Sequence, residues 1–299
     1  MAASMVVDRR EGKKAKHTKE SVGHKRKSDD DFYTKSATTS DEDDNSVIVA
    51  AFRSYQQELD RKHDKHERLV KLSRDVTIQS KRLIFLLHRI SSDNTRETIL
   101  VEADTKMNEI SVNLKNIAIE LEGEDPYQFL RAYTNGLQEY IEAISFYEYL
   151  LNKHILTLEA AQLKLKFKVN NLTEAELDKE SSGLLPETNK SEEIQLHLPP
   201  LEYVLGLADL TGELMRCCIN SIGHEDMDKP FELLTFMRNL YEGFSLCSRS
   251  ASRDLRQKMD TMRQSLVKVE NTCYTLQVRG SEIPKHMLLD AIKVEPQTA

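Results

Sequence analysis

One long stretch without glycine or proline limits most strongly what this chain can fold into. It runs from Val47 to Ile90, and its apolar residues recur at steps of three or four, or at sums of these steps. That spacing is typical of the buried face of an amphipathic α-helix. The helix would be about forty residues long, which exceeds the usual length in globular proteins. The first prediction is therefore a single long helix over this stretch.

Similar periodicity returns along most of the chain. It predicts further helices at 97–121, 126–154, 157–167, 200–222, 230–247 and 253–278, with a short one after Pro284. Proline at 126 suits the first turn of a helix. Ten glycines and seven prolines are too few for the many turns of an all-β fold. With no credible strand, we expect an all-α bundle of about seven long helices.

Loss of periodicity marks the segments outside this bundle. Residues 1–46 are polar, rich in Ser, Thr and Asp, and are predicted to be a disordered arm. Residues 170–198 are acidic and aperiodic, end in "LPP", and are predicted to be a flexible insertion. The helical domain would span 47–290, leaving 291–299 as a tail.

Cysteine use and hydropathy bear on the compartment. The cysteines at 217, 218, 247 and 273 form no CxxC pair, which argues against a zinc or disulfide framework and favours buried free thiols in a reducing compartment. We find no apolar signal core, and the longest apolar run, "LIFLL", is too short to span a bilayer. We expect a soluble intracellular protein without a membrane partner.

Two basic clusters, "DRREGKKAK" and "GHKRKSDDD", stand in the predicted arm, separated by a short spacer. This is the form of a bipartite nuclear-localisation signal. Its basic residues would be Arg9, Arg10, Lys13, Lys14, Lys25, Arg26 and Lys27. A signal of this kind predicts a protein of both cytoplasm and nucleus, whereas a merely solvated basic tail is the alternative.

The stretch "LGLADLTGELMRCC" places acids on a helix that is otherwise apolar and has no lysine. Asp209 and Glu213 lie on one narrow polar stripe, beside Gly206 and Gly212. Each interior glycine costs about 1 kcal/mol relative to alanine. A helix that is apolar around most of its circumference is largely buried, so its carboxylates need partners or a metal.

A second helix repeats this theme in "GLQEYIEAISF". Glu139 and Glu142 share one face, beside Gly136. The small residue leaves room for another helix, or for the backbone of a ligand, to approach. Two helices that each offer two acids are how helical bundles build cation sites. Carboxylate oxygens without histidine or thiolate favour magnesium or manganese over zinc.

A plainer interpretation of the four acids stays open. Glu139 and Glu142 could be surface charges, and Asp209 could pair with Arg216 or with a distant lysine. Four cations on the first helix present a similar choice between a phosphate-binding surface and a solvated face. They are Lys71, Arg74, Lys81 and Arg82.

Several long stretches resemble the translin family, in the branch whose members assemble with translin. They are "QELDRKHDKHERLVKLSRDVTIQSKRLIFLLHR", "GLQEYIEAISF", "LADLTGELMR" and "KVENTCYTLQVRGSEIPKHML". The resemblance covers roughly 47–290, apart from the insertion. It implies a seven-helix fold and a hollow hetero-octamer with translin. It also implies magnesium-dependent cleavage of single-stranded RNA, and activation of the RNA-induced silencing complex by removal of nicked passenger strands.

The same resemblance assigns the site residues. The family's catalytic acids fall on Glu139, Glu142 and Asp209, with Glu213 beside them as a further metal ligand. Translin itself lacks the full set, so the acids indicate the catalytic partner. We expect Glu142 and Glu213 to hold the metal, and Glu139 and Asp209 to complete the shell or orient water. Whether one or two ions bind is open.

The working hypothesis is therefore the catalytic subunit of a translin-containing endoribonuclease that also meets silencing-complex components. Single-stranded DNA as a second ligand is left open. The alternative is a non-catalytic adaptor and nuclear-import partner of translin. The chain has a net charge of −7, which disfavours phosphate binding by this chain alone and favours a basic partner subunit.

Replacing Lys25, Arg26 and Lys27 by alanine should shift the protein toward the cytoplasm, because the second basic cluster is then lost. Fluorescence microscopy of the tagged chain in cells without translin would measure the shift, with Lys19→Ala as the control. An unchanged nuclear fraction would contradict the signal.

Overall fold

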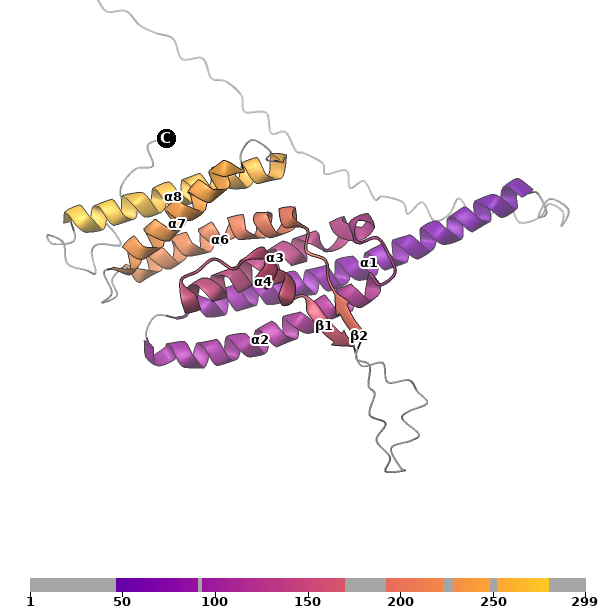
Figure 1. Ribbon diagram of the computed structural model, residues 1–299, viewed down its shortest axis with the longest axis horizontal. Helices are drawn as coiled ribbons and strands as arrows, with labels where there is room; N and C mark the ends of the chain where they lie inside the picture. The colour runs from indigo at the N-terminus through magenta and orange to yellow at the C-terminus, as the bar shows by residue number, and fades with distance from the viewer. Residues whose placement is uncertain (1–46, 91–92, 170–191, 223–227, 248–251, 280–299) are drawn as a thin grey trace, which may run out of the picture. The chain divides into compact units, whose positions relative to one another are not determined.

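The computed structural model describes residues 47–90, 93–169, 192–222, 228–247 and 252–279. Within these residues the chain forms seven helices and one small sheet, which confirms the all-α prediction (Figure 1). The elements are α1 Val47–Leu87, α2 Asp93–Glu120, α3 Pro126–Asn152, α4 Leu158–Leu163, β1 Lys166–Val169, β2 Glu192–Gln195, α6 Pro200–Ser221, α7 Lys229–Leu246 and α8 Arg253–Arg279.

The chain divides into two compact units, Met1–Gln56 and Gln57–Ala299. The described part of the first unit is residues 47–56, which form the first turns of α1. The second unit contains all the remaining elements. The predicted arm at 1–46, with its localisation signal, and the tail at 291–299 lie outside the described residues.

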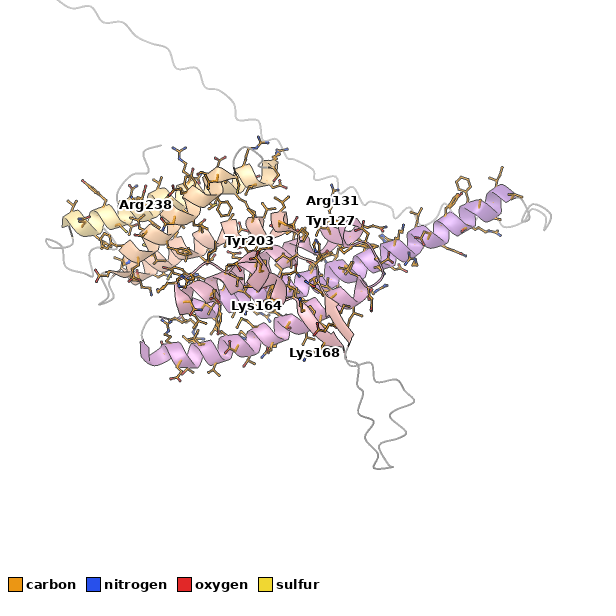
Figure 2. The ribbon with its side chains drawn as sticks, in the orientation of Figure 1. Tyr127, Arg131, Lys164, Lys168, Tyr203 and Arg238 are labelled. Atoms are coloured by element: carbon orange, nitrogen blue, oxygen red, sulfur yellow. The ribbon has the colours of Figure 1, made fainter. Side chains whose placement is uncertain are left out.

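Helix α6 lies at the centre of the second unit, in contact with α3, α7 and α8 (Figure 1). Gly206 sets the distance to α3, because a Cβ atom there would lie only 2.7 Å from the carbonyl oxygen of Gln138. On the other side, α7 and α8 pack together, and Arg238, labelled in Figure 2, donates to Glu270 at 2.8 Å.

A second glycine brings α1 against α3. The backbone N–H of Gly136 donates to Ser73 Oγ at 3.1 Å, and a Cβ atom at Gly136 would lie 2.6 Å from the Ser73 carbonyl oxygen. Gly136 and Gly206 therefore make room for neighbouring helices, one of the two roles expected of them. Gly212 differs, since a Cβ atom there would meet nothing within 4 Å.

Local capping explains where α3 begins and ends. The side chain of Asp125 accepts a hydrogen bond from the N–H of Tyr127, and Pro126 occupies the first turn. At the other end Lys153 adopts a left-handed conformation with φ 58°, and its N–H donates to the Tyr149 carbonyl. These ends lie within two residues of the predicted helix at 126–154.

The prediction of no strands is wrong at one place. The expected helix at 157–167 ends at Leu163, and β1 pairs antiparallel with β2, with Phe167 opposite Ile194. Alternation explains this, because Leu165 and Phe167 are buried while Lys166 is exposed. The predicted flexible insertion is likewise wrong at its end, since β2 lies inside 170–198. Its residues 170–191 lie outside the described part.

The thiol prediction holds for three of the four cysteines. Cys217, Cys218 and Cys273 are buried and free, whereas Cys247 is free but exposed at the end of α7. In the described part of the chain, no helix combines the length and the apolar character needed to cross a membrane.

The two glycines of α6 should respond oppositely to alanine. Gly206→Ala should lower the free energy of unfolding by about 1–3 kcal/mol, because its methyl group would clash with the α3 backbone. Gly212→Ala should raise it by about 0.5–1 kcal/mol, because the helix loses a flexible residue in open space. Urea unfolding of both variants measures the difference. Equal effects would contradict the close approach at Gly206.

Candidate active site

Three of the four predicted acids line one pocket of about 710 Å³ between α1, α3 and α6. We call it the acid pocket. It is lined by Lys81, Ile84, Phe85, His88, Glu139, Glu142, Glu213, Arg216, Ile219 and Asn220. Asp209, the fourth acid, lies one helical turn before Glu213 and is not part of the lining. The structure therefore brings both acid-bearing helices to one site, as their paired acids predict.

Glu142 is buried, with 9% of its surface exposed, and of the four acids Glu213 alone is less exposed, at 5%. Among the described residues Glu142 has no hydrogen-bond or ion-pair partner. Its pKa is raised to about 8, chiefly by burial and also by the negative charges of Asp209, Glu139 and Glu213. Lys258 acts in the opposite direction. Glu142 is thus held mostly protonated at neutral pH.

Two partners stabilise the ionised form of Glu213. His88 Nε2 lies 2.6 Å from Glu213 Oε2, and Arg216 donates to the other carboxylate oxygen. Burial opposes ionisation, but the His88 hydrogen bond and the Arg216 charge outweigh it, so the pKa of Glu213 is lowered. The His88 ring is held in place by Phe146, at a centroid distance of 4.8 Å.

Asp209 is bound by a lysine from α8. Lys258 Nζ donates to Asp209 Oδ2 at 2.5 Å, to Gln138 Oε1 at 2.9 Å and to the Leu205 carbonyl at 3.1 Å. The alternative of a distant lysine is therefore confirmed for Asp209, while Arg216 pairs with Glu213 instead. Glu139 is partly exposed and forms an ion pair with Lys81 at 3.1 Å.

Glu202, on the same polar stripe of α6, has a separate role. It is buried and accepts hydrogen bonds from Thr134 and, at 2.6 Å, from Gln138 Nε2. Since Gln138 also accepts from Lys258, a continuous hydrogen-bonded chain connects Glu202 to Asp209. It links α6, α3 and α8 beside the acid pocket.

The donor atoms of these residues are suited to a magnesium ion. The carboxylates supply the hard oxygen donors that this ion prefers, and Glu142 is a buried acid without a partner. In the arrangement described here, no three acidic, histidine or cysteine side chains are already grouped to hold a metal ion. Three of the four acids face a cation of the chain instead, so metal binding requires these ion pairs to be exchanged.

The predicted phosphate-binding cations lie on the exposed surface of α1. Lys81 lines the acid pocket, and with Arg82 it lines a neighbouring pocket of about 350 Å³. Lys71 lines a different pocket of about 370 Å³, and Arg74 lines none of these three. The structure brings Lys81 and Arg82 to the site and leaves Lys71 and Arg74 away from it.

Two residues of the site were missed from the sequence, His88 and Lys258. Phe85 lies four residues after Lys81, and His88 lies three residues after Phe85. These helical steps could have placed His88 on the same face of α1 as the other two. No local signal marks Lys258, because its partners lie on other helices.

The sequence is similar to that of known proteins over most of its length. The model of the Translin family matches residues 64–280. The chain belongs to the translin family. Translin-associated protein X of Mus musculus is 49% identical over 249 residues, covering 83% of this chain and 84% of that protein. Translin of Mus musculus is 23% identical over 232 residues, covering 77% and 92%. The predicted resemblance to the translin-associated branch of the family is confirmed.

A solved structure with a similar fold agrees with the architecture. The AfC3PO–duplex RNA complex superposes with a TM-score of 0.56 at 18% identity, covering 78% of this chain and all of that chain. At this identity the likeness concerns the fold. It supports the helical arrangement that carries the acid pocket.

Glu142→Gln should stabilise the metal-free protein more at alkaline than at acidic pH. Because the folded-state pKa is raised to about 8, stability from the protonated form is present below the unfolded pKa and is lost as pH rises through about 8. The glutamine cannot ionise, so its advantage should be small at pH 5 and reach a few kcal/mol at pH 8.5. Urea unfolding in EDTA measures it, and an advantage independent of pH would contradict the raised pKa.

Proposed function

We propose that this chain is the catalytic subunit of a magnesium-dependent endoribonuclease that works in complex with translin and cleaves single-stranded RNA. The observation that carries the proposal is Glu142, a buried acid without a partner among the described residues. It lines an open pocket with Glu139 and Glu213, and Asp209 lies one helical turn before Glu213. Burying an unpaired carboxylate among like charges is costly, so a cation-binding role is the best explanation for keeping it.

Glu139, Glu142, Asp209 and Glu213 would hold the ion, with manganese as a substitute for magnesium. A bound ion of this kind supplies a water of lowered pKa and offsets charge on the scissile phosphate. Glu142 would give up its proton on binding. His88 would keep Glu213 oriented through the 2.6 Å contact.

Two exposed cations at the pocket rim would bind the substrate backbone. Lys81 and Arg216 each expose 63% of the side chain, and both are already directed at acids of the pocket. If the acids held a metal ion in place of these ion pairs, Lys81 and Arg216 would be free to contact phosphate oxygens. The scissile phosphate would then lie between the rim cations and the acids.

Assembly with translin is supported by family membership and by charge. The chain has a net charge of −7 and needs basic surface from a partner to hold RNA strongly. Similarity to translin and to the AfC3PO–duplex RNA complex agrees with a hetero-oligomer that handles RNA. The proposed cellular role is removal of passenger-strand fragments from the silencing complex, in cytoplasm and nucleus, with single-stranded DNA still open as a ligand.

Glu142→Ala and Asp209→Ala should each reduce RNA cleavage by orders of magnitude, because a lost metal ligand removes several kcal/mol of transition-state stabilisation. Assembly with translin and RNA affinity should be nearly unchanged. Cleavage of a 5′-labelled single-stranded RNA in magnesium measures the effect.

Glu148→Ala is the matched control, because Glu148 lies on α3 but outside the acid pocket and pairs with Asn152. Substantial cleavage by an intact Glu142 or Asp209 variant, or by the wild-type complex in excess EDTA, would refute the proposal. A complex that binds RNA and never cleaves it would instead support the adaptor alternative.

A further inference from the structure

Phe85 is a large apolar side chain left in solvent at the edge of the acid pocket. It is 74% exposed on α1, and it lines both the acid pocket and the neighbouring 350 Å³ pocket. A single exposed apolar residue is ordinary. This ring, however, lines two pockets at once, and one of them contains the candidate catalytic acids, so a ligand of the site could contact it.

Cations lie on several sides of this ring, among the acids that also line the two pockets. Lys81 and Arg82 precede it by about one turn of α1, and Arg89 follows it by one turn. Lys106 of α2 lines the second pocket beside it, and Arg216 of α6 lines the first. An aromatic face flanked by cations is the combination by which proteins bind single-stranded nucleic acid, since the ring stacks on a base and the cations hold the phosphates.

The neighbours of Phe85 along the chain also connect it to the acids. Lys81 lies four residues before Phe85 and reaches Glu139 with its Nζ atom at 3.1 Å. His88 lies three residues after Phe85 and reaches Glu213 at 2.6 Å. The ring therefore lies between two side chains that touch the acids, on the same stretch of helix.

We propose that Phe85 forms a base-stacking subsite that holds one unpaired base of the RNA while the adjoining phosphate enters the acid pocket. The proposal rests on the proposed function and adds a source of substrate specificity to it. Bases of a duplex are already stacked on one another and paired, so only a single-stranded segment can offer a free face to the ring.

A protein partner is the other class of occupant for an exposed phenylalanine. Charged side chains are depleted at the centre of protein interfaces, whereas here several cations surround the ring. This composition favours a nucleic acid, and a protein contact is one of the outcomes that the test separates.

The test uses the full chain in complex with translin, in EDTA, with a single-stranded RNA and a duplex of the same sequence. Phe85→Ala and Phe85→Leu should each weaken binding of the single strand about ten-fold or more, and should leave duplex binding unchanged. Phe85→Trp should retain affinity. Tyr274→Ala is the matched control, because Tyr274 is 66% exposed on α8 and lines neither pocket.

A spectroscopic reading separates stacking from simple apolar contact. The chain contains no tryptophan, so Phe85→Trp introduces one reporter into it. Its emission, taken as the difference from the wild-type complex, should be quenched by the single-stranded RNA and not by the duplex. Full affinity in Phe85→Leu, or unquenched emission in Phe85→Trp, would overturn stacking.

Two further outcomes also overturn the subsite. One is an equal loss in Tyr274→Ala, and the other is loss of assembly with translin in the Phe85 variants, which identifies a protein contact. Because binding is measured in EDTA, the result is independent of cleavage. Quenching in the Phe85→Trp complex, together with a wild-type complex that never cleaves RNA, refutes the proposed function and supports the subsite. Cleavage by the wild-type complex, together with unaltered RNA affinity in the Phe85 variants, does the reverse.

Discussion

The close approach of α3 and α6 at Gly206 is the contact on which the site depends. A Cβ atom at this position would lie 2.7 Å from a backbone oxygen of α3, so no larger residue fits without moving one helix. The acids follow on both helices within two turns of this contact. Packing of the helices therefore forces the acids close together. The free energy gained by burying apolar side chains elsewhere in the bundle outweighs the repulsion between the acids.

The four acids differ in whether a cation of the chain balances their charge. Glu139, Asp209 and Glu213 each face a cation, drawn from α1, α8 and α6. Glu142 has none and responds by keeping its proton, as a buried acid among like charges does. Three of the four acids thus have an internal counterion that a metal ion could replace, and the fourth, Glu142, would ionise only when an external cation binds.

Periodicity was sufficient to predict the long helices and the pairing of acids, because residues three and four apart share a face whatever surrounds the helix. It could not predict Lys258, since nothing in a single helix specifies which neighbour it meets. Gly206 and Gly212 look alike in the sequence, yet one lies against a backbone and the other in open space. The strands were missed because four residues of alternation are too few to compete with a helical pattern, and their partners are separated by the insertion.

Lys258 makes the C-terminal helix part of the site's charge balance. Until α8 packs against α3 and α6, Asp209 has no counterion and Gln138 Oε1 has no hydrogen-bond donor from Lys258. The carboxylates of α3 and α6 would then repel one another. Helix α8, the last helix of the described residues, is then the one that relieves this repulsion. A chain truncated before α8 would lose more than an outer layer of packing, because it would carry an uncompensated negative charge beside its central helix.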